Sequence, residues 1–223
     1  MIKLIDNINT TLADDLKQSL DANSRLKIAA SYFSIYAYEA LKKELENIDE
    51  LQFLFTSPTF TTETATQHKL KENREFIIPK QKREKGIYGT EFEIHLKNKL
   101  TQKAIARECA DWIKRKVRIK SNITQDWLPE FIVEQNTTDS LYTGIQGFTP
   151  IGLGQERGNT LANFVQKIQE PTIAQSYISK FNQIWTDPET IRDVTEEVIR
   201  HIESVYQETV SYTHLTLPTT PYV

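Results

Sequence analysis

Hydrophobic and polar positions in the first part of the chain predict two buried strands joined through a helix. Short apolar runs at residues 26–33 and 51–55 are typical of strands that are covered on both faces. Between them, residues 36–48 place apolar side chains at helical spacing. A strand, a helix and a second strand in this order predict a parallel pair with a crossover helix, which is the basic unit of an α/β fold.

Further helices and strands are expected along the rest of the chain. Residues 10–22 predict a helix that has Asp14 and Asp15 in its first turn, where the helix dipole favours negative charge. Residues 92–116 predict the longest helix, and Asp187 followed by Pro188 predicts the start of a last helix over 188–208. The remaining expectations are strands at 117–120, 127–135 and 140–145 and helices at 159–169 and 173–185.

Two segments do not fit this alternating pattern. Residues 59–89 are polar and rich in Thr, Lys and Glu, which predicts an excursion from the core around 79–89. From Thr209 onward the chain has no Lys, Arg, Asp or Glu. This tail resembles the translation of a sequencing adapter, so we expect a truncated gene whose authentic part ends near Glu208. The alternative is an ordinary disordered tail that is rich in Thr and Pro.

Composition and charge exclude several classes of protein. The 223 residues are 39% hydrophobic and 26% charged, which is typical of a globular protein, and the formal net charge of −3 restricts any contact with nucleic acid to a local surface. A single cysteine, Cys109, excludes an internal disulfide framework and a cysteine-based metal cluster. We find no signal peptide or membrane-spanning run, so we expect a cytoplasmic protein without a membrane partner.

The densest basic run consists of five residues near the middle of the chain, namely Lys114, Arg115, Lys116, Arg118 and Lys120. Cations at the end of a helix are stabilised by the helix dipole, which is a purely structural explanation. The same residues could contact a phosphate backbone and make binding dependent on salt. A second basic stretch in the polar segment, with Lys80, Lys82, Arg83 and Lys85, leaves the same two alternatives open.

Candidate catalytic and metal-binding residues are few. His95-Leu96-Lys97 is a literal His-x-Lys, but it lies in a segment with a helical pattern, and Gln102 stands five residues beyond the lysine. The other histidines, His68, His201 and His214, lack the neighbours that would complete a metal site. There is also no phosphate-binding loop of the nucleotide-hydrolysing type. We therefore expect no catalytic residue, no metal and no cofactor in this chain.

The glycine-rich stretch from Tyr142 to Gly154, Tyr-Thr-Gly-Ile-Gln-Gly-Phe-Thr-Pro-Ile-Gly-Leu-Gly, resembles the strand-to-loop segment of phospholipase D-like domains. Active members carry a Gly-Ser-x-Asn-type loop shortly after a strand with His-x-Lys, and the histidine attacks a phosphodiester. In this chain Ile145 stands at the serine position and Gly147 at the asparagine position. Residues 130–135, the upstream strand candidate, contain neither histidine nor lysine.

Residues 91–121 and 29–41 make the resemblance more specific. They are similar to the central helix and to the first strand and helix of the phospholipase D-like domains that precede the motor of bacterial Snf-type (superfamily-two) helicases. The resemblance implies an α/β fold in which helices flank a mixed sheet, followed by a C-terminal helical arm. It divides the chain into a phospholipase D-like domain (1–170), a helical connector toward a missing helicase motor (171–208) and a non-native or disordered tail (209–223).

The expected function is that of a non-catalytic accessory module of an ATP-dependent DNA helicase or translocase, which binds DNA or docks another protein. Non-specific phosphate contacts would come from the basic run, while Thr149 and the loop from Gly144 to Gly154 would supply backbone N–H groups. Two alternatives remain. The chain could be an active phosphodiesterase that uses His95 and Lys97, or a protein-interaction subunit of a DNA-defence assembly.

Overall fold

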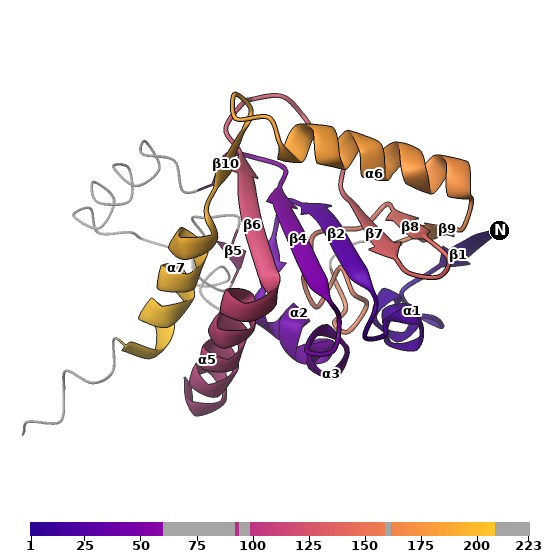
Figure 1. The fold of residues 1–223 in the computed structure, drawn as a ribbon. Coiled ribbons are helices and arrows are strands. Elements are labelled where there is room, and N and C mark those ends of the chain that lie inside the picture. Colours follow the sequence, from indigo (N-terminus) through magenta and orange to yellow (C-terminus); the bar gives the residue numbers. More distant parts are fainter. Residues whose placement is uncertain (60–91, 94–98, 159–161, 208–223) are drawn as a thin grey trace, which may run out of the picture.

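The structure is a computed structural model that describes residues 1–59, 92–93, 99–158 and 162–207. Within these residues, helices flank an eight-stranded mixed sheet, which confirms the predicted fold class (Figure 1). The strands of this sheet are β1 (Ile2–Ile5), β2 (Arg25–Ala30), β4 (Glu50–Phe55), β6 (Val117–Asn122), β7 (Phe131–Gln135), β8 (Ser140–Thr143), β9 (Val165–Ile168) and β10 (Ile191–Asp193). The helices are α1 (Leu12–Ser19), α2 (Ile35–Ala40), α3 (Lys42–Leu45), α5 (Lys99–Lys116), α6 (Pro171–Trp185) and α7 (Thr195–Gln207).

The strand order is β1-β9-β8-β7-β2-β4-β6-β10, with a parallel centre and antiparallel flanks. Strands β2, β4 and β6 are parallel neighbours, which confirms the strand–helix–strand unit expected from the first sixty residues. Strand β7 pairs with β2 in the antiparallel direction, and β8, β9 and β1 continue that half of the sheet. Strand β10 pairs antiparallel with β6 and covers the other edge.

The two faces of the sheet are covered unequally. Helices α1, α2, α3 and α5 lie on one face, whereas α6 crosses the other (Figure 1). The larger core lies under the first group and includes Phe53 and Trp112, neither of which is exposed to solvent. The smaller core lies under α6 and is formed by Leu54 and Phe131 of the sheet together with Phe181. Alternate residues of β4 therefore point into different cores, as the pleat of a strand requires.

A network of charged side chains is buried in the antiparallel half of the sheet. The Asp15 carboxylate accepts hydrogen bonds from Lys3 (2.6 Å), Lys167 (2.7 Å) and the Tyr142 hydroxyl (3.0 Å). Burial alone would raise the pKa of Asp15, but the hydrogen bonds from Lys167 and Lys3 outweigh it, so that the pKa is lowered. Burial raises the pKa of the neighbouring Glu134. This network links α1 to β1, β8 and β9.

The helix expected at 159–169 is wrong, because residues 165–168 form strand β9 between β8 and β1. Val165 and Lys167 point into the protein and Gln166 points out, which is the alternation of a strand. Lys167 hides the strand pattern in the sequence, because a charged residue stands at a position that points inward. Its ion pair with Asp15 compensates the buried charge. Residues 159–161 lie outside the described part of the chain.

The helix expected from Pro188 also begins too early. The Asp187 side chain does accept hydrogen bonds from the backbone N–H of Glu189 and the hydroxyl of Thr190, both at 3.0 Å. The chain then extends as β10 along the edge of β6, and helix α7 starts only at Thr195. Thr195 is buried, and its hydroxyl bonds both the N–H and the carbonyl of Ile119 in β6. Helix α7 contacts α5 and β6, while β10 belongs to the main sheet.

Two other helices differ from their predicted bounds. Residues 36–48 contain two short helices, α2 and α3, instead of one. In the predicted helix 92–116, Phe92–Glu93 form strand β5, which pairs with β3 (Phe33–Ser34), and α5 runs only over Lys99–Lys116. Cys109 is fully buried in the larger core. The basic stretch at 80–85 and the pair His95 and Lys97 lie outside the described residues, as do residues 208–223.

Candidate functional site

Strands β2, β4 and β6 all end at one side of the sheet, which we call the carboxyl edge and define by Ala30, Phe55 and Asn122. Strand β8 also ends there, because Thr143 pairs with Phe131 and Phe131 pairs with Ala29. The glycine-rich loop therefore leaves the sheet at this edge. Ligands of open α/β sheets generally bind outside the carboxyl ends of parallel strands, which makes the carboxyl edge the candidate binding site.

Glu130 dominates the chemistry of the carboxyl edge. One carboxylate oxygen accepts a hydrogen bond from the backbone N–H of Ser31 (3.1 Å), and the other accepts one from the N–H of Gly147 (2.6 Å). The carboxylate thus bridges the segment after β2 and the glycine-rich loop. Backbone N–H groups that converge in this way commonly hold anions. At the carboxyl edge, the protein provides its own anion for them.

Hydroxyl and amide groups around Glu130 fasten the neighbouring loops. The hydroxyls of Ser31 and Thr56 are hydrogen-bonded to each other at 2.8 Å. The Asn122 amide donates to the carbonyls of Thr56 and Asp126, both at 3.0 Å. No histidine, lysine or cysteine of the described residues makes a hydrogen bond to these hydroxyls. They consequently lack the base that a serine or threonine nucleophile needs.

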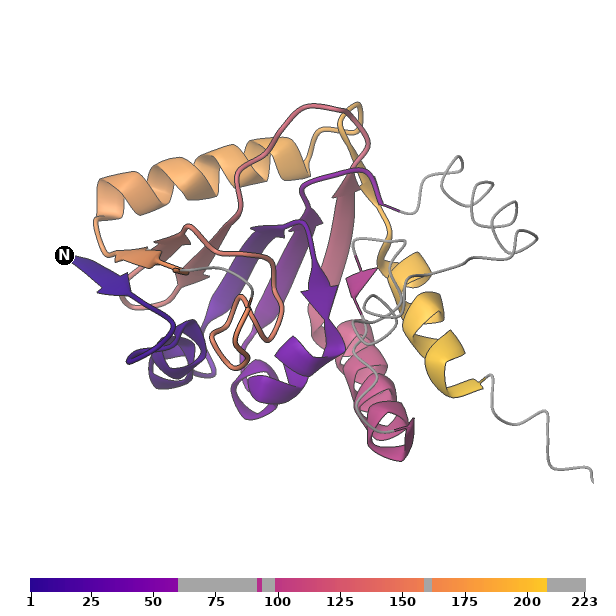
Figure 2. The same ribbon diagram turned by 180° about the vertical axis from the view of Figure 1, so that it is seen from behind.

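The glycine-rich loop is fastened to α1 and to the start of α2 (Figure 2). The carbonyl of Leu153 accepts a hydrogen bond from the N–H of Ala13 (3.0 Å), and the carbonyl of Phe148 accepts one from Ser34 (3.0 Å). Gly147 has a φ of +71°, and a side chain there would meet the Cβ atom of Tyr32 at 3.1 Å. An asparagine would therefore be strained at this position.

The side chains of two other residues of the glycine-rich loop are buried inside the protein. Ile145, at the serine position of the resemblance, is buried in the larger core. Thr149 is buried as well, and its hydroxyl accepts a hydrogen bond from the N–H of Gly152 (3.0 Å). The N–H of Phe148 donates to the Tyr32 carbonyl (2.8 Å). These loop groups therefore make their contacts within the protein.

The basic run of the sequence is divided between two sides of the sheet. Lys114, Arg115 and Lys116 end helix α5 on the larger-core side. Lys114 forms an ion pair with Glu203 (2.7 Å), and Arg115 forms one with Glu46 (2.8 Å). The Lys116 ammonium donates to the carbonyl of Ile48 (2.6 Å). These cations are at the end of the helix, where the dipole stabilises them.

Arg118 and Lys120 lie on the opposite face of the sheet, because Val117 and Ile119 between them point into the larger core. Lys120 donates to the carbonyl of Trp185 (2.9 Å), and its ammonium lies 4.9 Å from the centre of the Trp185 ring. Arg118 is exposed and forms no hydrogen bond or ion pair with the described residues. The five cations therefore do not form one continuous patch.

Apolar side chains are exposed near the carboxyl edge, which the sequence did not reveal. Tyr32 follows β2, Trp127 precedes β7 and Phe164 precedes β9, with exposed fractions of 46%, 85% and 55%. A hollow of about 290 Å³ next to Trp127 is lined by Asn122, Leu128 and Ile184 among others. Isolated exposed aromatic residues are common, and these three come from separate segments at one side of the sheet.

The described part of the chain offers neither a metal site nor a membrane-spanning helix. No group of three or more His, Cys, Asp or Glu side chains there is arranged to hold a metal ion. No helix among the described residues is both long enough and apolar enough to cross a membrane.

Comparison with known proteins gives distant likenesses among solved structures only. No family model and no curated protein matches the chain. Among solved structures, a phosphatidylserine synthase from Haemophilus influenzae Rd KW20 is similar over 93% of this chain, with 14% sequence identity and a TM-score of 0.45. The similar region is 43% of the synthase chain, so this protein spans less than half of its length.

Replacing Glu130 with alanine is expected to loosen the carboxyl edge. The N–H groups of Ser31 and Gly147 would lose a charged acceptor, and we expect the free energy of unfolding to fall by about 2–3 kcal/mol. Amide hydrogen exchange at Ser31 and Gly147 should accelerate more than exchange in β4. The Glu130→Gln variant keeps an acceptor oxygen and should lose about half as much. Equal exchange in the parent and the alanine variant would contradict the bridging role.

Proposed function

We propose that this chain is a non-catalytic accessory module of phospholipase D-like architecture, which helps to hold an ATP-dependent DNA helicase or translocase on DNA. The non-catalytic part of this proposal is supported best by the Glu130 carboxylate, which accepts hydrogen bonds from the N–H groups of Ser31 and Gly147. In active members of the resembled family, a phosphodiester is attacked beside the glycine-rich loop. Here a fixed negative charge stands beside that loop.

The electrostatics of the carboxyl edge oppose hydrolysis of a phosphodiester. The carboxylate of Glu130 repels a phosphate group and already occupies the N–H of Gly147. The hydroxyls of Ser31 and Thr56 bond each other instead of a base. Both the attack on phosphorus and the stabilisation of its charge would have to come from other residues. These features favour a binding role over hydrolysis of a phosphodiester.

Contact with DNA is attributed to the basic residues at the end of α5 and on β6. The side chains of Lys114 and Arg115 are 46% and 57% exposed, and ion pairs at such exposure contribute only about 0–1 kcal/mol. A phosphate group can therefore replace Glu203 or Glu46 as the partner at little cost. Arg118 is exposed without a described partner, but it lies on the opposite face of the sheet, so any phosphate contact that it adds is separate from the contact at the end of α5. Such contacts hold the backbone without reading sequence.

The expected result is DNA binding that weakens steeply with salt. Removal of Lys114, Arg115 and Lys116 together by alanine substitution should lower affinity at least tenfold in low salt. Each lost phosphate contact should reduce the slope of log affinity against log salt by about 0.9 for a duplex. Fluorescence anisotropy with a labelled duplex of arbitrary sequence measures both quantities. The Arg118→Ala variant should reduce the slope by about one contact.

Two controls make this test decisive. Lys17→Ala removes an exposed cation from α1, away from the basic run, and should leave the slope unchanged. Incubation of the parent protein with single-stranded and double-stranded DNA should give no cleavage product. Affinity that does not change with salt would refute the DNA contact. Cleavage that disappears in His95→Ala would instead favour the active phosphodiesterase.

The exposed side chains near the carboxyl edge favour a second candidate, a pure protein-interaction module. Tyr32, Ile123 and Trp127 present apolar surface there, while Glu130 is poorly suited to a phosphate backbone. This function predicts a protein partner that is recovered without nucleic acid. Its binding should be lost in Trp127→Ala and kept in the triple variant of Lys114, Arg115 and Lys116. The opposite pattern would favour the DNA-binding function.

A further inference from the structure

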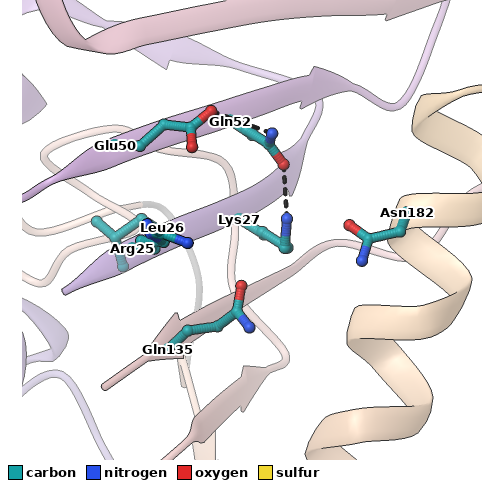
Figure 3. Close-up of a pocket in the computed structure, with 7 residues that line it drawn as sticks. All are labelled: Arg25, Leu26, Lys27, Glu50, Gln52, Gln135 and Asn182. Atoms are coloured by element: carbon teal, nitrogen blue, oxygen red, sulfur yellow. Dashed lines mark hydrogen bonds between the residues drawn. The ribbon is translucent and has the colours of Figure 1, made fainter. Parts of the chain in front are cut away.

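A polar hollow lies on the α6 face of the sheet, at the opposite end from the carboxyl edge. Its volume is about 300 Å³, and its lining includes Arg25, Lys27, Glu50, Gln52, Gln135 and Asn182 (Figure 3). The strand register places these groups together, because Arg25 pairs with Glu50 and Gln135, and Lys27 pairs with Gln52. Asn182 comes from α6 and faces Lys27 across the hollow (Figure 3).

Lys27 is the unusual residue of the hollow. It is only 8% exposed, yet among the described residues its ammonium donates a hydrogen bond only to the neutral Gln52 side chain, at 2.6 Å. The ammonium also lies 5.2 Å from the centre of the Phe181 ring. Among the described residues, no carboxylate lies within 4.0 Å of it. Buried cations are normally paired with an anion, because an uncompensated charge is costly to remove from water.

The nearest carboxylates are engaged elsewhere. Glu50 accepts a hydrogen bond from the Gln52 amide (3.1 Å), and Asp49 is paired with Arg25 (2.7 Å). Desolvation lowers the pKa of Lys27, as expected for an ammonium that lacks a close anion. The amide groups of Gln135 and Asn182 have no hydrogen bond to another described residue at this hollow. The amides of Gln135 and Asn182 point into this space, and each can present either its NH2 group or its oxygen there. Among the described residues, Gln52 is the one side chain that accepts a hydrogen bond from the Lys27 ammonium.

We propose that this hollow binds the carboxylate group of a small organic acid. The ligand would supply the missing countercharge to Lys27, and the amides of Asn182 and Gln135 would donate to its oxygens. This site is separate from the carboxyl edge and from the proposed DNA contact of α5. It therefore goes beyond the proposed function and does not depend on it.

Charge balance favours a carboxylate over a phosphate monoester. The lining of the hollow holds two cations, Arg25 and Lys27, and one carboxylate, Glu50, so it has one positive charge more than negative charges. A carboxylate matches that single charge. A phosphate monoester carries close to two negative charges at neutral pH and would leave an excess beside Glu50.

The test is a titration of the full chain with sodium propionate, a monocarboxylate, followed by NMR of the backbone amides of Lys27, Gln52 and Asn182. Sodium chloride at equal ionic strength and inorganic phosphate serve as reference ligands. We expect saturable shifts with propionate at these amides and only small, linear shifts with chloride. The Lys27→Met variant keeps the length of the side chain without its charge and should weaken propionate binding at least tenfold.

Two further variants keep the test informative. Asn182→Ala changes an exposed position of α6 and should weaken binding several-fold even if Lys27→Met fails to fold. Lys17→Met on the other face should leave binding unchanged. Tighter binding of phosphate than of propionate, or equal shifts with chloride, would overturn the proposal. Saturable binding that survives in both Lys27→Met and Asn182→Ala would also overturn it.

Discussion

Replacement of Asp15 by alanine is expected to lower the free energy of unfolding by about 3–5 kcal/mol, because it leaves the buried ammonium of Lys167 without its carboxylate. Lys167 is 9% exposed, and its distance to Asp15 is 2.7 Å. The Tyr142 hydroxyl and the Lys3 ammonium would lose their acceptor as well. Urea denaturation followed by far-UV circular dichroism measures the loss.

The effect of this substitution should depend on pH. Since the pKa of Asp15 is lowered in the folded protein, its stabilisation is complete above the ordinary carboxyl range and is lost as pH falls through the folded pKa. The difference between parent and variant should be largest near pH 7 and should shrink below about pH 4. Glu134 acts in the opposite direction, because its raised pKa makes the folded state take up its proton first. Glu134 is present in both proteins, but the Asp15 charge is one of the causes that raise its pKa, so the substitution also weakens this opposing contribution.

Asp14→Ala is the matched control, because Asp14 occupies the same first turn of α1 but is exposed. We expect it to change stability by no more than about 0.5 kcal/mol. Equal losses for the two substitutions, or a loss that does not shrink as pH falls well below about 4, would show that the buried ion pair is not the cause.

A second large effect is expected for Trp112→Ala, with a loss of about 3–5 kcal/mol. The Trp112 ring is fully buried and lies 4.9 Å from the ring of Tyr38, and its indole N–H donates to the carbonyl of Leu45 (2.9 Å). The substitution would open a cavity between α5 and the helices that follow β2. The Trp112→Phe variant retains much of the packing and should lose about 1–3 kcal/mol, mainly from the unpaired carbonyl.

Trp127→Ala provides the control for Trp112, since the same residue type is 85% exposed there. Its stability should stay within about 0.5 kcal/mol of the parent. Guanidinium denaturation followed by circular dichroism at 222 nm gives both values. Comparable losses at the two positions would mean that Trp127 is buried by an interaction in solution.

The sequence predicts the central part of this fold because its signals there are local. The apolar runs at 26–33 and 51–55 correspond to strands β2 and β4, each of which has six residues and is buried for most of its length. Short edge strands are different. Residues 191–193 form a strand only because Ile191 finds the edge of β6, whereas the Asp187-Pro188 sequence has every local feature of a helix start. The structure of such segments depends on pairing with a distant strand, and a short stretch of sequence carries no information about that pairing.

The candidate site was less predictable than the fold. The glycine-rich loop was visible in the sequence, as was the absence of histidine and lysine in the strand before it. The role of Glu130 was not, because its partners Ser31 and Gly147 are brought to it only by the pairing of β7 with both β2 and β8. Lys27 is another example, since a lysine within an apolar run gives no indication of the neighbours that its strand will acquire.

The order of the strands affects how the chain can fold during its synthesis. Strand β1 is made first, but its partner β9 comes more than three-quarters of the way to the last described residue. Until β9 leaves the ribosome, Ile5 has no sheet to join and Asp15 has no Lys167 to pair with. The nascent protein must therefore keep its amino-terminal segment unassembled while the parallel centre forms. Such long-range closure is slow and exposes apolar surface, so chaperones that bind nascent chains should have their main effect on this first segment.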